Sequence, residues 1–404
     1  MHTEGMEVST REQLINQIRV KFNLQFGKEP DNITLAPGRI NIIGEHTDYN
    51  DGLAMPVAID RWICAAVCRS NSESSTIYSL NYNESAVITP HALGKFQAIW
   101  KQLASASIHV LITEFSIEEG ANMTVGGNIP IGCGLSSSSA FIISITQAFC
   151  QLFSIPMEDL QLAHICQKIE NRALGTAGGL LDQYGIILSK KDHFMMIDFQ
   201  DNSIEYLPLS LNGCSWLVVN SGINRELSES EYIYRVKECR DGLEILKNRF
   251  NITGFRDIDK NMLPELESEH KVSHKRLRHL LDENNRVKEM KVQLKKGNKK
   301  RIGKILQESH ESLRSLYQAS CKEIDYIVQL SESFDGWYGG RIIWGGFGGC
   351  SLHLIADNMI EKYRKYISKS FGKKHGIKLD IIDVQFSGGL SCTNDKCEYS
   401  GTAK

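Results

Sequence analysis

The sequence lacks the long apolar runs and the one-sided charge that mark several common classes of protein. No uninterrupted apolar stretch approaches the roughly 18 to 20 residues that span a bilayer, and residues 1–13 are polar and acidic, unlike a signal peptide. We therefore expect a cytoplasmic protein with no membrane partner. The formal net charge is only −2 over 404 residues, so the charge balance gives no indication of a nucleic-acid partner.

The 11 cysteines include no CxxC pair. An odd number of scattered thiols risks mispairing in an oxidising compartment, so this pattern favours a reducing cytoplasm. The closest spacings, Cys64 with Cys68 and Cys392 with Cys397, lack the paired ligand sets of a zinc site. The spacing therefore argues against a structural metal.

The chain is long enough for two domains, because single hydrophobic cores rarely grow past about 250 to 300 residues. We predict an N-terminal domain of residues 1–210 and a C-terminal domain of residues 211–404, with the change of lobe near 205–215. Apolar periodicity predicts helices over 10–27, 137–153, 157–173, 228–250 and 300–332. It predicts a strand, a bend and a second strand over 52–68, and further strands over 123–127, 194–197 and 216–220. The charged run 266–301 is interpreted as a solvated helical face.

A glycine-rich segment, NIPIGCGLSSSSA at 128–140, lies between a predicted strand and a predicted helix. Gly132 and Gly134 allow a ligand to approach the backbone, and the amides that open the helix present the positive end of its dipole. The four serines at 136–139 add hydroxyls for phosphate oxygens or a phosphate-bound cation, whereas a helix cap needs one. The alternative is a glycine turn with a serine cap. No Walker A sequence occurs, so a nucleotide would need this different phosphate site.

Two carboxylates stand out in the next segment. Glu170 lies on an otherwise apolar helical line, and a magnesium ion that bridges to nucleotide phosphates would give its charge a partner. The alternative is a glutamate at the edge of the stripe that reaches solvent. Asp182 follows a glycine pair in GTAGGLLDQYG at 175–185, where the backbone could approach a substrate. An ordinary Asx turn would also explain that aspartate.

The segment 35–60, LAPGRINIIGEHTDYNDGLAMPVAID, crowds charged and polar groups between apolar residues. Recognition of a polyhydroxylated molecule needs such groups, because each buried hydroxyl without a partner is costly. GRINIIGEHTDYNDG resembles the signature of galactokinases, within the larger family of galactokinase, homoserine kinase, mevalonate kinase and phosphomevalonate kinase. PIGCGLSSSSA, GGLLDQYG and GGFGGCSLHLI at 345–355 resemble the other motifs of that family, and the resemblance covers nearly the full chain.

The resemblance implies an α/β (α+β) fold of the two-lobed small-molecule kinase type, with an N-terminal mixed-sheet lobe, a C-terminal ferredoxin-like lobe and the active site between them. It implies an ATP-dependent sugar kinase that phosphorylates the C1 hydroxyl of galactose, with ATP as co-substrate and Mg²⁺ as metal. We expect a monomer whose partners are the sugar and ATP.

Position by position, the resemblance assigns roles to residues of this sequence. The catalytic pair is Asp182, beside the attacking hydroxyl, and Arg39, near both that hydroxyl and the transferred phosphoryl group. The sugar hydroxyls are bound by Glu45, His46, Asp48, Gly179 and Tyr232. ATP is bound by Gly132, Gly134, Ser136, Ser137, Ser138, Gly345 and Gly346. Magnesium is held by Ser138 and Glu170.

A carboxylate beside a guanidinium is a poor proton acceptor, so we expect Asp182 to orient the hydroxyl first and to accept its proton late. Three residues depart from the pattern usual in galactokinases: Trp344, Gly178 and Leu181 stand where glycine, cysteine and methionine are usual. A related sugar such as N-acetylgalactosamine therefore stays an alternative substrate. A sugar-sensing regulator that binds galactose and ATP without turnover is the alternative of a different class.

Overall fold

The computed structural model describes residues 10–89, 96–176, 178–209, 211–223, 228–343 and 348–393. For residues 228–230 it describes the backbone only. Its six-stranded sheet has the order β13-β1-β3-β6-β4-β5. All neighbouring strands are antiparallel except β4 and β6, which are parallel. The strands are β1 (Asn32–Asn41), β3 (Pro56–Arg69), β4 (Ser75–Ser79), β5 (Glu84–Ile88), β6 (Ala121–Gly127) and β13 (Ser391–Cys392).

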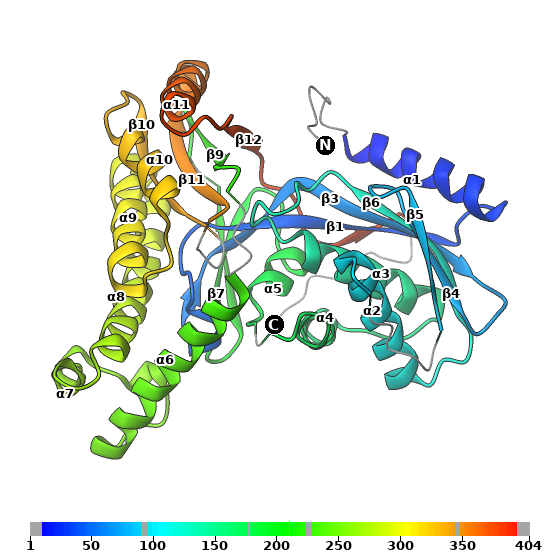
Figure 1. Cartoon of the computed structure of the whole chain (residues 1–404), viewed down its shortest axis with the longest axis horizontal. Helices are drawn as coiled ribbons and strands as arrows, with labels where there is room; N and C mark the ends of the chain where they lie inside the picture. The colour runs from blue at the N-terminus through cyan, green and yellow to red at the C-terminus, as the bar shows by residue number, and fades with distance from the viewer. Residues whose placement is uncertain are drawn as a thin grey trace.

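Helices cover both faces of this sheet (Figure 1). Helix α1 (Arg11–Phe26) begins at a capping box on Thr10 and packs Leu14, Ile18 and Phe22 on one face. On the other face, α3 (Ser137–Leu152) packs against β1 and β3, α2 (Ile99–Phe115) contacts α3 and β5, and α4 (Asp159–Leu174) packs on α2 and α3. Because helices bury the sheet from both sides, every residue of β1 is buried, and buried residues do not alternate with exposed ones along this strand.

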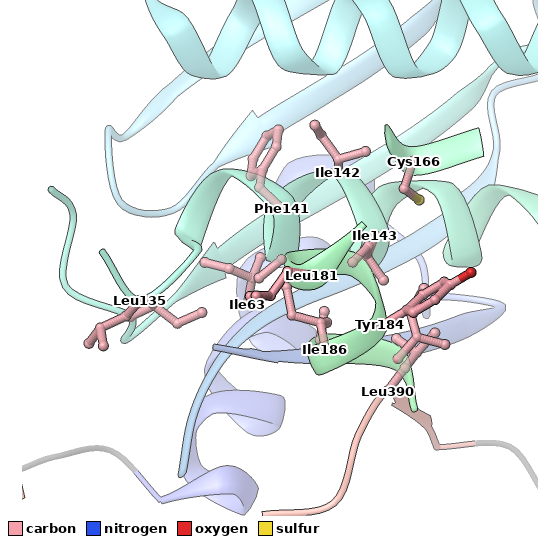
Figure 2. Close-up of a cluster of buried hydrophobic side chains, with 14 of the residues drawn as sticks. Ile63, Leu135, Phe141, Ile142, Ile143, Cys166, Leu181, Tyr184, Ile186 and Leu390 are labelled. Carbon is pink, nitrogen blue, oxygen red and sulfur yellow. The ribbon is translucent and has the colours of Figure 1, made fainter. Parts of the chain in front are cut away.

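A three-stranded sheet of order β2-β7-β8 completes the first lobe. Its strands are β2 (Leu53–Ala54), β7 (His193–Asp198) and β8 (Ser203–Pro208), and the short helix α5 (Leu181–Ile187) lies beside β1 and β3. Figure 2 shows Leu181, Tyr184 and Ile186 of α5 directed into the same apolar cluster as Ile143 of α3. This packing fixes the first turn of α5, which carries Asp182, against the start of α3.

The second lobe has an antiparallel sheet of order β10-β11-β9-β12. Along the chain this lobe consists of a strand, a group of helices, two strands, a helix and a last strand. With the sheet order above, this is the ferredoxin-like arrangement that was expected. Its elements are β9 (Cys214–Asn220), α6 (Ser228–Arg249), α7 (Pro264–Glu267), α8 (Lys271–Lys295), α9 (Lys299–Ser312), α10 (Lys322–Glu332), β10 (Trp337–Ile342), β11 (Cys350–Ala356), α11 (Ile360–His375) and β12 (Asp380–Val384). Short 3₁₀ turns are η1 (Asp48–Asn50), η2 (Phe255–Asp257), η3 (Lys260–Met262) and η5 (Asp357–Met359).

The change of sheet lies between β8, which ends at Pro208, and β9, which begins at Cys214. We propose this stretch as the lobe boundary. The end of the chain returns to the first lobe, because β13 pairs with β1 and Phe386 bridges to Ile59. Over the residues described, no helix combines the length and apolar character needed to cross a membrane.

The region 300–332 was predicted as a long amphipathic helix, and that prediction is wrong. Helix α9 ends at Ser312, a π-helical turn η4 (Leu313–Tyr317) follows, and α10 begins only at Lys322. Gln318 ends the turn in the left-handed conformation, at φ 55°. The physical reason is tertiary: Arg235 and Arg276 donate to the carbonyls of residues 316–318, which a continuous helix would use for itself.

The charged run 266–301 does form a helix, α8, but one of its faces is not solvated. Arg276, His279 and Glu283 are 2%, 0% and 0% exposed. Buried charges must be paired: Arg276 pairs with Glu238 of α6, whereas His279 and Glu283 contact the turn that follows β1 in the first lobe. The interpretation as a solvated face therefore fails for this stripe of the helix.

Candidate active site

A cavity of about 210 Å³ lies where the turn after β1 meets α4, α5 and α6. All the residues predicted to be catalytic or sugar-binding line it: Arg39, Glu45, His46, Asp48, Gly179, Asp182 and Tyr232. The predicted magnesium ligands Ser138 and Glu170 line it too. Gly345 and Gly346, predicted to bind ATP, lie outside the described residues, as does the departure at Trp344.

Arg39 and Asp182 form a direct ion pair at the centre of this site. Arg39 is 3% exposed on β1, and its Nε donates to Asp182 Oδ1 over 2.7 Å while Nη2 donates to the same oxygen. The Ser136 hydroxyl donates to Asp182 Oδ2 over 2.6 Å. Both oxygens of the carboxylate are thus held by groups distant in sequence, not by a local Asx turn.

The glycine-rich loop turns its serine hydroxyls toward the two carboxylates. Gly132, Gly134 and Ser136 all have left-handed backbone conformations, at φ 76°, 69° and 58°. Ser136 is the N-cap of α3, yet its side chain makes no capping bond and reaches Asp182 instead. The capping alternative is therefore wrong. Ser137 opens the helix, so its amide lies at the positive end of the α3 dipole.

Glu170 points into the site rather than to solvent, contrary to the snorkelling alternative. Its carboxylate accepts hydrogen bonds from Ser138 over 2.8 Å, from Ser139 over 2.9 Å and from Gln183 Nε2 over 2.7 Å. Burial and then the nearby charge of Asp182 raise the pKa of Glu170 to about 7, although these hydrogen bonds oppose the rise. Ser139 and Gln183 were not predicted as site residues, although Ser139 belongs to the serine run and Gln183 adjoins Asp182.

The oxygen ligands around Glu170 suit a magnesium ion. A carboxylate and the Ser138 hydroxyl are hard oxygen donors, and Mg²⁺ uses only one or two protein carboxylates. Among the ion pairs of the described residues none involves Glu170, so its charge lacks a cationic partner there. Within the same residues no three His, Cys, Asp or Glu side chains are arranged so that they could hold a metal ion by themselves.

Of the predicted sugar-binding residues, Glu45, His46 and Asp48 lie on the turn between β1 and β2, whereas Gly179 precedes α5 and Tyr232 belongs to α6. The turn reverses at Gly44, φ 95°, where an added Cβ would lie 2.3 Å from the Leu53 carbonyl oxygen. His46 follows in the left-handed conformation, at φ 63°. Burial, then the charges of Asp182 and Glu45, raise the pKa of Asp48 to about 7. Burial and the charge of Asp48 raise the pKa of the Tyr232 hydroxyl well above its usual value.

Three residues of the second lobe hold this turn and were not predicted. Arg341 donates to Glu45 Oε1 over 3.0 Å, and Glu283 accepts from the Gly44 amide over 3.0 Å. His279 Nε2 lies 3.2 Å from the Glu45 carbonyl oxygen. In the sequence these residues belong to an ordinary charged run and an ordinary strand, and nothing local marks them as buried.

Two family profiles match the chain. Residues 20–69 match the galactokinase galactose-binding signature, and residues 100–190 match the GHMP kinases N terminal domain. The first match covers the turn with Glu45, His46 and Asp48. The second covers the glycine-rich loop, Glu170 and Asp182.

Curated relatives match along most of their length. Galactokinase of Thermotoga maritima is 35% identical over 355 residues, which cover 88% of this chain and 98% of that protein. Galactokinase of Clostridium perfringens is 32% identical over 381 residues, which cover 93% of this chain and 98% of that protein.

Solved structures show the same fold. Lactococcus lactis galactokinase complexed with galactose superposes with a TM-score of 0.87 at 26% identity, and the match covers 94% of this chain and 99% of that one. A mevalonate kinase superposes with a TM-score of 0.60 at 20% identity, covering 88% of this chain and 99% of that one, and supports the fold alone.

Proposed function

The chain belongs to the galactokinase family, and we propose that it transfers the γ-phosphate of ATP to the C1 hydroxyl of galactose, giving galactose 1-phosphate. The observation that carries this proposal is the shared cavity. One concave site brings together the Arg39 and Asp182 pair, the Ser138 and Glu170 pair, and the polar turn of the galactose-binding signature.

Asp182 and Arg39 are the proposed catalytic residues. The carboxylate, held by Arg39 and Ser136, orients the sugar hydroxyl and accepts its proton late in transfer. Phosphoryl transfer has a loose transition state, so positioning and charge neutralisation carry most of the rate. Arg39 supplies one fixed positive charge, and it is oriented by the Gly134 carbonyl, to which Nη1 donates over 2.7 Å.

Glu170 and Ser138 are the proposed ligands for magnesium on the phosphates of ATP, and the glycine-rich loop with Ser136 to Ser138 is the proposed phosphate site. When bound, the ion would neutralise phosphate charge. The residues fit it because Glu170 must lose its proton to bind a cation, and its pKa near 7 allows that at neutral pH.

The proposed sugar site consists of Glu45, His46, Asp48, Gly179 and Tyr232, which supply acceptors and donors around the cavity. Gly178 also lines the cavity, and an added Cβ there would meet only Asn171 Oδ1, at 3.5 Å. Glycine at position 178 leaves space in the cavity that the usual cysteine side chain would occupy. This space favours N-acetylgalactosamine, the larger sugar, as the second candidate substrate. We also propose a monomer in the cytoplasm that has no nucleic-acid or membrane partner.

A coupled ADP-release assay tests the proposal across galactose, N-acetylgalactosamine, galactosamine, glucose, arabinose and galacturonate. We expect the highest kcat/KM with galactose. A higher value with N-acetylgalactosamine would change the substrate but keep the chemistry. ADP release with none of the sugars, together with galactose binding by calorimetry, would support a non-catalytic sensor instead.

A further inference from the structure

Tyr317 lies at the interruption that divides the predicted long helix of 300–332. It is the last residue of the π-helical turn η4 and is fully buried. Single π turns are rare, and they are found frequently at functional sites. Arg235 Nε donates to the Tyr317 carbonyl oxygen over 2.9 Å, and Arg276 donates to the carbonyl of Leu316. The backbone is therefore held in this unusual turn by two buried arginines.

The turn brings the Tyr317 ring into contact with two histidines from different lobes. Its centroid lies 4.4 Å from that of His46 in a stacked arrangement, at 26° between the planes. The His279 centroid lies 4.6 Å from that of Tyr317 in a tilted arrangement. Burial lowers the pKa of His279 to about 4, so its ring is neutral. Its Nε2 donates to the Glu45 carbonyl, and its Nδ1 accepts from Ser312 over 2.8 Å.

The Tyr317 hydroxyl is also connected to His46. Tyr49 Oη lies 2.7 Å from His46 Nδ1 and 2.8 Å from Tyr317 Oη. Cys239 Sγ, on α6, lies 3.3 Å from Tyr317 Oη. The Tyr317 side chain is therefore linked to His46 in two ways: its ring stacks on the imidazole, and its hydroxyl reaches the imidazole through the Tyr49 hydroxyl.

His46 needs such support because its backbone is in the left-handed conformation, which non-glycine residues adopt sparingly and which the surroundings must maintain. Tyr317 does not line the cavity, whereas His46 and Tyr49 do. We propose that Tyr317 is a positioning residue for sugar binding, which holds His46 toward the sugar from the second lobe. This inference rests on the proposed role of His46 in binding galactose.

The test uses two substitutions of different severity in the full chain. Tyr317→Phe keeps the ring and removes the hydroxyl bridge, and we expect the galactose KM to rise about threefold. Tyr317→Leu removes the stacked ring as well, and we expect a rise of about tenfold or more. The KM for ATP should stay within about twofold of the wild-type value in both variants, because the contacts of Tyr317 lead to the sugar turn and not to the glycine-rich loop.

Tyr363→Phe is the matched control. Tyr363 is equally buried in the same lobe, and its hydroxyl bonds to Ser331 and His353, away from the cavity. A galactose KM unchanged in Tyr317→Leu, or an ATP KM that rises as much as the galactose KM, would overturn the proposal. If the leucine variant does not fold, the phenylalanine variant decides by the same criteria.

Galactose binding measured by calorimetry without ATP separates this inference from the proposed function. If the wild-type chain binds galactose but releases no ADP, the proposed function fails while the dissociation constants of the variants still test Tyr317. A wild-type chain that turns galactose over, with equal affinities in Tyr317→Leu and Tyr363→Phe, would contradict the positioning role alone.

Discussion

The Asp48 carboxylate lies so close to Gly179 that a Cβ added to the glycine would be 1.9 Å from Asp48 Oδ2. No L side chain fits there unless Asp48 moves. Both residues line the cavity, and they come from different segments: Asp48 from the turn after β1 and Gly179 from the loop before α5. The glycine thus allows these two segments to approach each other closely at the proposed sugar site.

Gly179→Ala should raise the galactose KM by at least about tenfold, because Asp48 must leave the position in which it would meet a sugar hydroxyl. Steady-state kinetics with both substrates measures this. Gly372→Ala is the control, since an added Cβ in that helix meets nothing closer than the Ile377 carbonyl oxygen at 3.7 Å. An unchanged galactose KM in Gly179→Ala would show that Asp48 does not touch the sugar.

Asp182→Asn and Arg39→Lys should both lower kcat. For Asp182→Asn we expect a loss on the order of 100- to 10,000-fold, the range typical of a lost proton-transfer group. Arg39→Lys keeps the charge but loses the fork that contacts Asp182 and Gly134 together, so it should also lose activity.

The control for Arg39 is Arg61→Lys on neighbouring β3, which is 6% exposed and pairs with Asp60 outside the cavity. It should retain wild-type turnover. Activity close to wild type in Asp182→Asn or in Arg39→Lys would remove that residue from the proposed mechanism.

Glu170→Gln should have opposite effects on stability and activity. The pKa of Glu170 is raised to about 7 in the folded ligand-free protein, chiefly by burial. The folded state therefore binds this proton more tightly than the unfolded state, so the associated stability is present below about pH 4 and is lost as the pH rises through 7.

Glutamine carries no such proton, so at pH 8 the variant should be more stable than the wild type, by on the order of 1 to 3 kcal/mol, with little difference at pH 4. Thermal melts at the two pH values measure this. Magnesium-dependent ADP release should fall sharply in the same variant. A Glu170→Gln protein that is less stable than wild type at pH 8 would contradict the assigned protonation.

Glu283→Gln should weaken the contact between the lobes. Burial alone would raise the pKa of Glu283, but positive charges led by Arg286 outweigh it and hold the pKa at about 2. The stabilisation is therefore complete above the unfolded pKa, near 4, and is lost as the pH falls toward 2. At pH 7 we expect a loss of about 2 to 4 kcal/mol, because Arg286 keeps a charge on a side chain that is only 12% exposed.

Denaturant unfolding at pH 7 and pH 3 measures this difference, which should shrink at the lower pH. Glu289→Gln on the same helix is the control: its pair with Arg301 is partly exposed and should contribute less than about 1 kcal/mol. Equal losses in the two variants at pH 7 would mean that Glu283 is no more important than a surface ion pair.

Much of the fold follows from local patterns in the sequence. Helices α1, α3 and α4 lie within one to two residues of their predicted bounds, because each has apolar residues at helical spacing that are buried in the first lobe. The strand β3 was predicted from small and branched residues at strand-like alternation, and β6, β7 and β9 also lie at segments predicted to be strands. The motifs also indicated which residues would gather around the cavity.

Tertiary contacts decided the rest. Whether Ser136 caps a helix or binds Asp182, and whether Glu170 faces solvent or the site, depends on groups 46 and 13 residues away, respectively. The π turn at Tyr317 and the buried face of α8 are invisible in the sequence, because arginine, histidine and glutamate look alike in a solvated helix and in a paired, buried one. Local periodicity sets which segments become helices or strands, whereas only the packing of the two lobes determines which charges are desolvated and paired.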